Sequence, residues 1–377
     1  MIEDLTRNAV DVLPAGGLEE KLKLGRPLRV KMGIDVTAPH VTLGNGIPLQ
    51  RMRAFQDAGH VGVLIVGDYT TRIGDPSGRS AERPILEPEE IDRNAQRFFD
   101  HASRIIDPER TEVRFNSEWL KELDFAAVLA LTRTVTVAQL LERDDFAKRF
   151  AAREPISVSE LLYPLMQAYD SVAIEADVEL GGTDQLYNLL AGREVMQAYG
   201  LDPQVVLTVP LLLAWDGEKM SGSKGNYIGL AEAPEEQFGK TMRIPDSQLE
   251  EWYRLVLERE VPAGEPMDAK LALARAIVGR SHGDEGAAQA EAHFTRVVRE
   301  GQAPDDVPAI PLPEGDPVHL PALLAAAFGL STSEARRLIG QGGLKVDGVV
   351  VTELDTPRAE LVGATLQAGK RRFAKLR

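Results

Sequence analysis

The sequence predicts an α/β fold built on a doubly wound parallel sheet, and three segments near its start carry this prediction. Residues 28–34, LRVKMGI, have the composition of a strand. The run VGVLIVG at 61–67 is continuously apolar, as in parallel strands that are buried on both faces. Between them, apolar residues recur at helical spacing from Ile47 until Gly59. Strand, helix and strand in this order make a βαβ unit, which is typical of α/β folds.

The remaining elements follow the same alternation along the chain. Residues 86–160 have mainly amphipathic helical patterns, and we interpret them as an insertion between the two halves of the sheet. Further strands are expected at 172–180 and 205–213, with a helix between them. Residues 231–300 are again helical and charged.

Proline content marks the clearest boundary in the chain. Residues 302–317, QAPDDVPAIPLPEGDP, hold five prolines and are interpreted as a linker. The sequence therefore predicts a doubly wound α/β domain over 1–228, an α-helical domain over 229–301, and a small α+β domain over 318–377.

Composition excludes several classes of protein. The chain has 377 residues, of which 44% are hydrophobic and 27% are charged, and this balance is ordinary for a globular protein. It has no cysteine, which excludes disulfides, a thiol nucleophile and cysteine-ligated metal sites. The six histidines are scattered, so we expect no protein-bound metal. No apolar run is long enough to span a bilayer and the start lacks signal-peptide features, so we expect a cytoplasmic protein without membrane contact.

Charge is unevenly distributed along the chain. The net charge is −15, but residues 331–377 carry a net +4, so the remainder carries −19. A basic module on an acidic body indicates that any nucleic-acid contact is concentrated at the C-terminus. A merely basic tail is the alternative, and composition alone does not choose between them.

Four polar stretches fall near the ends of the expected strands. Residues 33–45 place small and hydroxyl residues before a helix, where backbone N–H groups suit phosphate, or where they simply cap a turn. Residues 74–83 combine a carboxylate with two arginines, which could hold an amine and a phosphate or form a solvated turn. Residues 219–226 contain two lysines and two serines, as in a loop that closes on polyphosphate or in an ordinary surface loop.

The fourth stretch is helical. Tyr163, Gln167 and Asp170 are spaced i, i+4 and i+7, so a helix places them on one face among apolar neighbours. This spacing predicts a pocket that reads a polar ligand, although the solvent face of an amphipathic helix gives the same pattern.

Taken together, these stretches resemble bacterial tyrosyl-tRNA synthetases, class I enzymes with a Rossmann-like catalytic domain. The resemblance runs from about residue 15 to the end and includes VGDYTTRIGDPSGRSAERP, NSEWL, TVAQLLERDDF, LLYPLMQAYDSVAIEADVELGGTDQLYNLLAGRE and DGEKMSGSKGNYIGL. The tail STSEARRLIGQGGLKVDGVVV is similar to an S4 RNA-binding domain. The helical domain over 229–301 then corresponds to the part of the family that lies near the tRNA anticodon.

The resemblance implies a two-step reaction. Tyrosine attacks ATP to give tyrosyl-adenylate and pyrophosphate, and the tyrosyl group then passes to the 3′ end of tRNA(Tyr). It also implies Mg²⁺ accompanying ATP as substrate, and a homodimer.

The resemblance also assigns residues to roles. It implies that Asp170 accepts the phenol hydroxyl and that tyrosine is bound by Gly33, Asp75, Tyr163, Gln167, Asp170 and Gln185. ATP would be contacted by Asp35, Thr37, Gly44, Gly182, Asp184, Met220, Ser221 and Ser223. Groups acting on the phosphates would be Thr42, Asn45, Arg79, Arg83, Lys219 and Lys224. RNA would be bound by Arg336, Arg337, Lys345, Lys370, Arg371 and Arg372.

Two signatures of the family are altered in this chain. The HIGH signature falls on Thr42-Leu43-Gly44-Asn45, so both histidines are replaced, and the second lysine of KMSKS falls on Gly222. Lys224 follows two residues later. The resemblance therefore favours a functional tyrosine–tRNA ligase with an intact tyrosine pocket. The alternatives are a divergent paralogue with altered ATP activation or another acceptor, and an RNA-binding or regulatory protein on the same scaffold.

Overall fold

The structure is a computed structural model that describes residues 1–37, 40–73, 87–300, 307–369 and 372–377. Contacts divide the chain into two compact units, residues 1–232 with 243–273 and residues 233–242 with 274–377. The domain boundaries expected from the sequence stay predictions.

The first unit is built on a six-stranded sheet. In spatial order its strands are β1 (Asp11–Leu13), β6 (Val205–Val209), β5 (Val178–Gly182), β2 (Arg29–Ile34), β3 (Val61–Val66) and β4 (Thr111–Phe115). All neighbours from β6 to β4 pair in parallel, and only β1 pairs antiparallel, at the β6 edge. The chain moves in one direction from β2 to β3 and β4, and in the other from β5 to β6. This order confirms the doubly wound parallel sheet.

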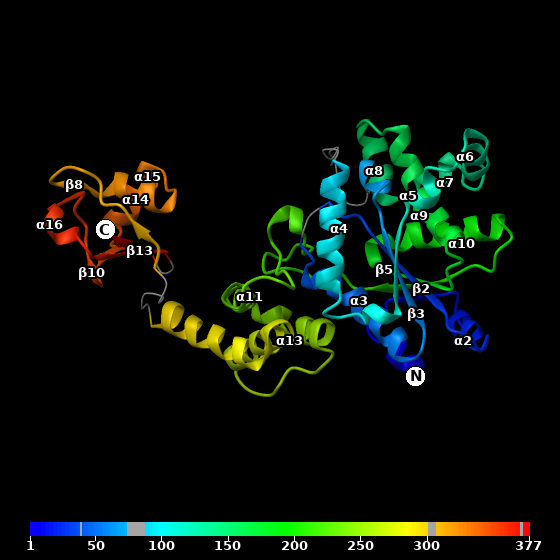
Figure 1. Ribbon diagram of the computed structural model, residues 1–377, viewed down its shortest axis with the longest axis horizontal. Helices are drawn as coiled ribbons and strands as arrows, with labels where there is room; N and C mark the ends of the chain where they lie inside the picture. The colour runs from blue at the N-terminus through cyan, green and yellow to red at the C-terminus, as the bar shows by residue number, and fades with distance from the viewer. Residues whose placement is uncertain (38–39, 74–86, 301–306, 370–371) are drawn as a thin grey trace. The chain divides into compact units, whose positions relative to one another are not determined.

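Helices cover both faces of this sheet, and α3 (Leu43–Asp57) and α10 (Leu186–Ala198) lie on opposite sides (Figure 1). Both are crossover helices between parallel strands, and both carry apolar residues toward the sheet. Helix α9 (Val158–Ala173) packs against α10. Other helices of the unit are α1 (Ile2–Leu5), α2 (Gly17–Leu22), α4 (Pro88–Ala102), α5 (Ser117–Leu120), α6 (Phe125–Thr132), α7 (Val137–Leu141), α8 (Asp144–Ala152) and α12 (Leu249–Trp252).

Three details differ from the sequence expectation. Residues 86–160 are mainly helical, but they also supply β4, which pairs with β3 inside the main sheet. The strand expected at 172–180 starts only at Val178, because α9 continues to Ala173. The strand expected at 205–213 ends at Val209, because Pro210 has no N–H group for the ladder.

The second unit contains α11 (Pro234–Thr241) and, from Ala274 onward, the rest of α13 (Pro266–Phe294). Together with α12 they confirm the helical character expected for 231–300. No helix in the described part of the chain is long and apolar enough to cross a membrane.

The C-terminal part of the second unit is a small α+β module. Leu324, Ile339, Leu344 and Leu366 are among its fully buried core residues. Its elements are β7 (Ala309–Ile310), β8 (Val318–His319), α14 (Leu320–Phe328), α15 (Thr332–Gly340), β9 (Leu344–Val346), β10 (Val349–Val350), β11 (Asp355–Thr356), α16 (Arg358–Leu361), β12 (Thr365–Ala368) and β13 (Arg372–Leu376). This module has its own core, as expected for a separate C-terminal segment.

Candidate active site

A cavity of about 530 Å³ opens where the carboxyl ends of four parallel strands meet. Asp35 follows β2, Gly67 follows β3, Gly182 ends β5 and Pro210 follows β6, and all four line the cavity. The strand order reverses between β2 and β5, so the cavity lies at the switch point of the sheet. Ligands of open α/β sheets bind at this position.

Most residues that the sequence assigned to ligand binding line this one cavity. They are Gly33, Asp35, Thr37, Thr42, Gly44, Asn45, Tyr163, Gln167, Asp170, Gly182, Asp184, Gln185, Lys219, Met220, Ser221 and Ser223. Lys224 is not among the lining residues. Asp75, Arg79 and Arg83 lie outside the described residues. The structure thus gathers segments that are far apart in the sequence.

Asp170 lines the cavity and is only 3% exposed. Trp119 Nε1 donates to its Oδ1 at 2.8 Å. Burial raises the pKa of Asp170 to about 7, while the positive charge of Lys31 and the hydrogen bonds from Trp119 and Asn116 act in the opposite direction. A buried carboxyl on the cavity lining suits a ligand hydroxyl, which can form a hydrogen bond with it.

A second hydrogen-bond chain runs beside Asp170. Tyr163 Oη donates to Asp35 Oδ2 at 3.0 Å, and Thr70 Oγ1 donates to Asp35 Oδ1 at 2.9 Å. Asn116 Nδ2 in turn donates to Thr70 Oγ1 at 3.1 Å. Asp35 therefore orients Tyr163, a contact that its assignment to the ATP side did not include. Gly67 is required here, because a Cβ atom at that position would lie 2.3 Å from both Asp35 Oδ1 and Thr70 Oγ1.

Two amide side chains line the cavity. Gln167 Nε2 donates to Glu179 Oε1 at 3.2 Å, so its carbonyl oxygen is the group it offers to a ligand. Gln185 Oε1 accepts from Asn188 Nδ2 at 3.0 Å. Arg143 donates to Asn188 Oδ1 at 2.8 Å and holds that amide in place. The Gln167 acceptor on this cavity matches an ammonium group.

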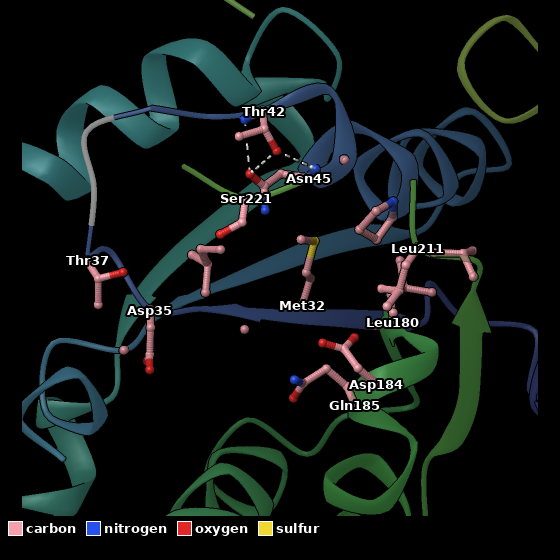
Figure 2. Close-up of a pocket in the computed structure, with 18 of the residues that line it drawn as sticks. Met32, Asp35, Thr37, Thr42, Asn45, Leu180, Asp184, Gln185, Leu211 and Ser221 are labelled. Atoms are coloured by element: carbon pink, nitrogen blue, oxygen red, sulfur yellow. Dashed lines mark hydrogen bonds between the residues drawn. The ribbon is translucent and has the colours of Figure 1, made fainter. Parts of the chain in front are cut away.

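The N-terminus of α3 forms another wall of the cavity. Thr42 is its N-cap, and Thr42 and Asn45 form a capping box. Thr42 Oγ1 donates to Asn45 Oδ1 at 2.9 Å and accepts from the Asn45 backbone N–H at 3.2 Å. Figure 2 shows this pair across the cavity from Asp184 and Gln185. The Thr42 hydroxyl and the Asn45 side-chain oxygen are both engaged in the cap. The donors that this end of the helix offers to an anion are therefore the side-chain NH₂ group of Asn45 and backbone N–H groups of the first turn.

The loop after β6 carries two lysines, of which Lys219 lines the cavity. Lys219 Nζ pairs with Asp184 Oδ2 at 2.5 Å, whereas Lys224 Nζ pairs with Glu218 Oε2 at 3.2 Å. His40 also lines the cavity and stacks on Tyr227, with ring centroids 5.2 Å apart. Of the two lysines in this loop, Lys219 lines the cavity and Lys224 does not.

Sequence reasoning missed several residues that shape the site. Asn116 and Trp119 reach Asp170 or its neighbours, and Lys31 lies beneath the pocket. The stretch NSEWL contains the first two and was noted only as part of the resemblance. The signal that could have identified Asn116 and Trp119 is their position directly after residues 111–115, TEVRF, which have the composition of a strand.

The C-terminal module places several basic residues on its surface. Arg336 and Arg337 are exposed on α15, and Arg372 is exposed on β13. The pKa of Glu334 is lowered mainly by hydrogen bonds from Ser331, with further contributions from the charges of Arg337 and Arg372. Both arginines therefore lie near Glu334. Lys345 is half-buried on β9, and Lys370 and Arg371 lie outside the described residues.

Fold and cavity together define an α/β protein that binds a ligand at the switch point of a Rossmann-like sheet. The family model "tRNA synthetases class I (W and Y)" matches residues 23–299, and the S4 domain model matches residues 320–357. The chain belongs to this class I tRNA synthetase family and carries an S4 domain.

Known proteins of similar sequence span the whole chain. The tyrosine–tRNA ligase of Moorella thermoacetica is 47% identical over 390 residues, which cover 99% of this chain and 94% of that protein. The tyrosine–tRNA ligase of Thermotoga maritima is 45% identical over 395 residues, covering 100% and 96%. Among solved structures, tyrosyl-tRNA synthetase of Archaeoglobus fulgidus complexed with L-tyrosine has a TM-score of 0.63 at 23% identity, covering 77% of this chain and 98% of that one. This last likeness supports the fold.

The raised pKa of Asp170 predicts a pH-dependent stability. The folded protein keeps this proton up to about pH 7, whereas the unfolded chain loses it near the ordinary value of 3.8. The folded state therefore loses stability relative to the unfolded state as pH rises from about 4 to 7, by up to about 4 kcal/mol. Urea unfolding measures the free energy of unfolding of wild type and of Asp170→Asn across this range. As pH rises to about 7, wild type should lose stability relative to Asp170→Asn, and above that pH the difference should stay constant. A difference that is constant with pH would contradict the assignment.

Proposed function

We propose that this protein is a tyrosine–tRNA ligase that activates L-tyrosine with ATP and transfers it to the 3′ end of tRNA(Tyr). The observation that carries the proposal is a cavity lined both by a buried carboxyl and by anion-binding groups. Asp170 supplies the first, and the N-terminus of α3 with Lys219 supplies the second. An amino acid with a phenol hydroxyl fits beside Asp170, and ATP fits beside the anion-binding groups.

Tyrosine recognition follows from the polarity of the pocket. The phenol hydroxyl would lie against Asp170, while the carbonyl oxygen of Gln167 would accept from the α-ammonium group. Gln185 and Tyr163 also line the cavity and would contact the amino acid, as the family resemblance implies. Asp75 and Gly33 complete the set that the family resemblance assigns to tyrosine.

Activation then requires positioning and charge stabilisation. A tyrosine carboxylate oxygen attacks the α-phosphorus of ATP, the bond to the bridging oxygen breaks, and pyrophosphate leaves with the electron pair. Lys219 and the α3 N-terminus lie where they would stabilise phosphate charge. Arg79, Arg83 and Lys224 are proposed as further cations for pyrophosphate. Mg²⁺ would enter with ATP as part of the substrate.

A second candidate within the family is a divergent paralogue that activates tyrosine slowly or for another acceptor. The capping box favours it, because Thr42 is engaged with Asn45 where the family signature has a histidine. An RNA-binding or regulatory role on the same scaffold is less well supported, since the polar residues of the tyrosine pocket converge on one cavity.

We further propose that the protein is a homodimer in the cytoplasm. Large apolar side chains are unusually exposed on α6, α8 and the start of α9, including Phe125 at 77%, Phe150 at 64% and Val158 at 74%. Exposed apolar surface of this kind is typical of a protein interface. A second copy of the chain would cover it, and sedimentation equilibrium would measure the mass of that assembly.

Tyrosine-dependent exchange between ATP and pyrophosphate tests the proposed function. Wild type should catalyse this exchange with tyrosine and charge tRNA(Tyr). Asp170→Ala should reduce the preference for tyrosine over phenylalanine by roughly 10- to 100-fold, because the hydrogen bond to the phenol is lost. Asp57→Ala, which removes an exposed carboxylate on α3, should keep wild-type preference. An Asp170→Ala enzyme that rejects phenylalanine as well as wild type does would remove Asp170 from substrate recognition.

The two lysines of the loop after β6 should differ in their effects. Lys219→Ala should slow single-turnover adenylate formation by about 10²- to 10³-fold, the usual loss for one transition-state donor. Lys224→Ala should slow the same step to a smaller extent, with little change in tyrosine affinity, because its contact forms with departing pyrophosphate. Glu218→Gln, which releases Lys224 from its ion pair, is the matched control and should not slow the step. A Lys224→Ala rate equal to wild type would remove that lysine from activation.

The S4 module should bind tRNA through its exposed arginines. Arg337→Ala and Arg372→Ala should each weaken tRNA binding and lower the slope of log affinity against log salt by about 1. Lys23→Ala, an exposed change in the first unit, should leave that slope unaltered. Adenylate formation should be the same in all three variants. Unchanged slopes for both arginine variants would place the RNA contact elsewhere.

A further inference from the structure

Lys31 lies in the middle of the central strand β2, with a side chain that has no exposed surface. Its ammonium group has three N–H donors, and three acceptors surround it. They are Glu179 Oε1 at 2.9 Å, Ser171 Oγ at 2.7 Å and the backbone oxygen of Gln167 at 2.8 Å. The charge is therefore fully hydrogen-bonded inside the protein, which is the condition under which a buried lysine is tolerated.

Glu179 is the partner of Lys31 across the sheet. The two residues are paired in the register of β5 with β2, and the Glu179 side chain is only 1% exposed. Its Oε1 also accepts from Gln167 Nε2, and its Oε2 accepts from Ser171 Oγ and from Gln204 Nε2. Each carboxylate oxygen thus has two donors.

Stability alone does not account for this pair. Desolvating two charges costs several kcal/mol, and apolar residues of similar volume often stabilise a fold equally well or better. Val30, Met32, Val178 and Leu180 alternate with the pair on the same two strands, so they face the other side of the sheet, and all four are apolar and buried. A paired lysine and glutamate at this depth therefore calls for a role other than holding the sheet together.

We propose that the Lys31–Glu179 pair is a positioning element that orients the Gln167 amide in the amino-acid pocket. The proposal rests on the tyrosine-ligase function given above. The pair holds Gln167 twice, at its backbone oxygen through Lys31 and at its side-chain nitrogen through Glu179. Because a carboxylate accepts only from the NH₂ side of the amide, the carbonyl oxygen is left to face the ligand. That oxygen is the acceptor that an α-ammonium group requires.

A double variant isolates this role. Lys31→Met/Glu179→Leu removes both charges together, keeps the side-chain volumes similar, and leaves no unpaired charge. It should fold with a circular dichroism spectrum like that of wild type. The Gln167 amide would then have no carboxylate to define which of its ends faces the pocket.

Three ligands separate orientation of the amide from general damage to the pocket. Tyrosine carries both charged groups, tyramine lacks the carboxylate, and 3-(4-hydroxyphenyl)propionate lacks the ammonium group. In the double variant the affinities for tyrosine and tyramine, measured by calorimetry, should fall by roughly 10- to 100-fold, whereas the affinity for the propionate should change little. In exchange kinetics the KM for tyrosine should rise more than kcat falls.

Asp177→Asn is the matched control. Asp177 is 2% exposed, ion-paired with Arg26 at 2.7 Å, and lies just before β5, but it does not line the cavity. Any loss of affinity in this variant should be the same for all three ligands. If the apolar double variant fails to fold, Lys31→Gln/Glu179→Gln provides a neutral polar pair, for which the same selective loss is expected at smaller magnitude.

Two results would overturn the proposal. One is a folded double variant with unchanged affinity for tyramine, and the other is an equal loss for all three ligands. Failure of the proposed function is distinguishable, because wild type would then bind neither tyrosine nor tyramine before any variant is compared.

Discussion

The parallel pairing of β2 with β5 is the constraint on which the rest of this structure depends. It joins the two halves of the sheet, and the order of the strands reverses at this point. The carboxyl ends of both halves are thereby brought to one edge, where the cavity lies. The same pairing places Lys31 opposite Glu179. The register of β2 with β5 therefore determines both the sheet and the position of the ligand site.

Electrostatics give two parts of the cavity lining different chemistry. The carboxyl of Asp170 has a raised pKa because burial penalises its charge. The positive end of a helix and a lysine also line the cavity, and they suit phosphate. A neutral aromatic ring with a hydroxyl fits the first environment, and a nucleotide fits the second. The reacting carboxylate would then lie between them.

The structure gives a local physical explanation for only one of the two altered signatures. Thr42 and Asn45 replace two histidines, and they stabilise the start of α3 by capping each other. The helix end thus keeps its anion-binding backbone without a side-chain imidazole. His40 stands at the same cavity on Tyr227, so an imidazole is still present near this end. Nothing in the structure explains the replacement of lysine by Gly222.

The sequence by itself determined those features that lie within one element. The apolar run at 61–67 gave a buried parallel strand, and the spacing of Tyr163, Gln167 and Asp170 gave one helical face, because periodicity reports the faces of the element that carries it. Only the tertiary structure decided which elements meet. The contact of Trp119 with Asp170, and the burial of Lys31 against Glu179, join segments far apart in the chain. Such contacts depend on strand order and packing, and no local pattern of residues encodes them.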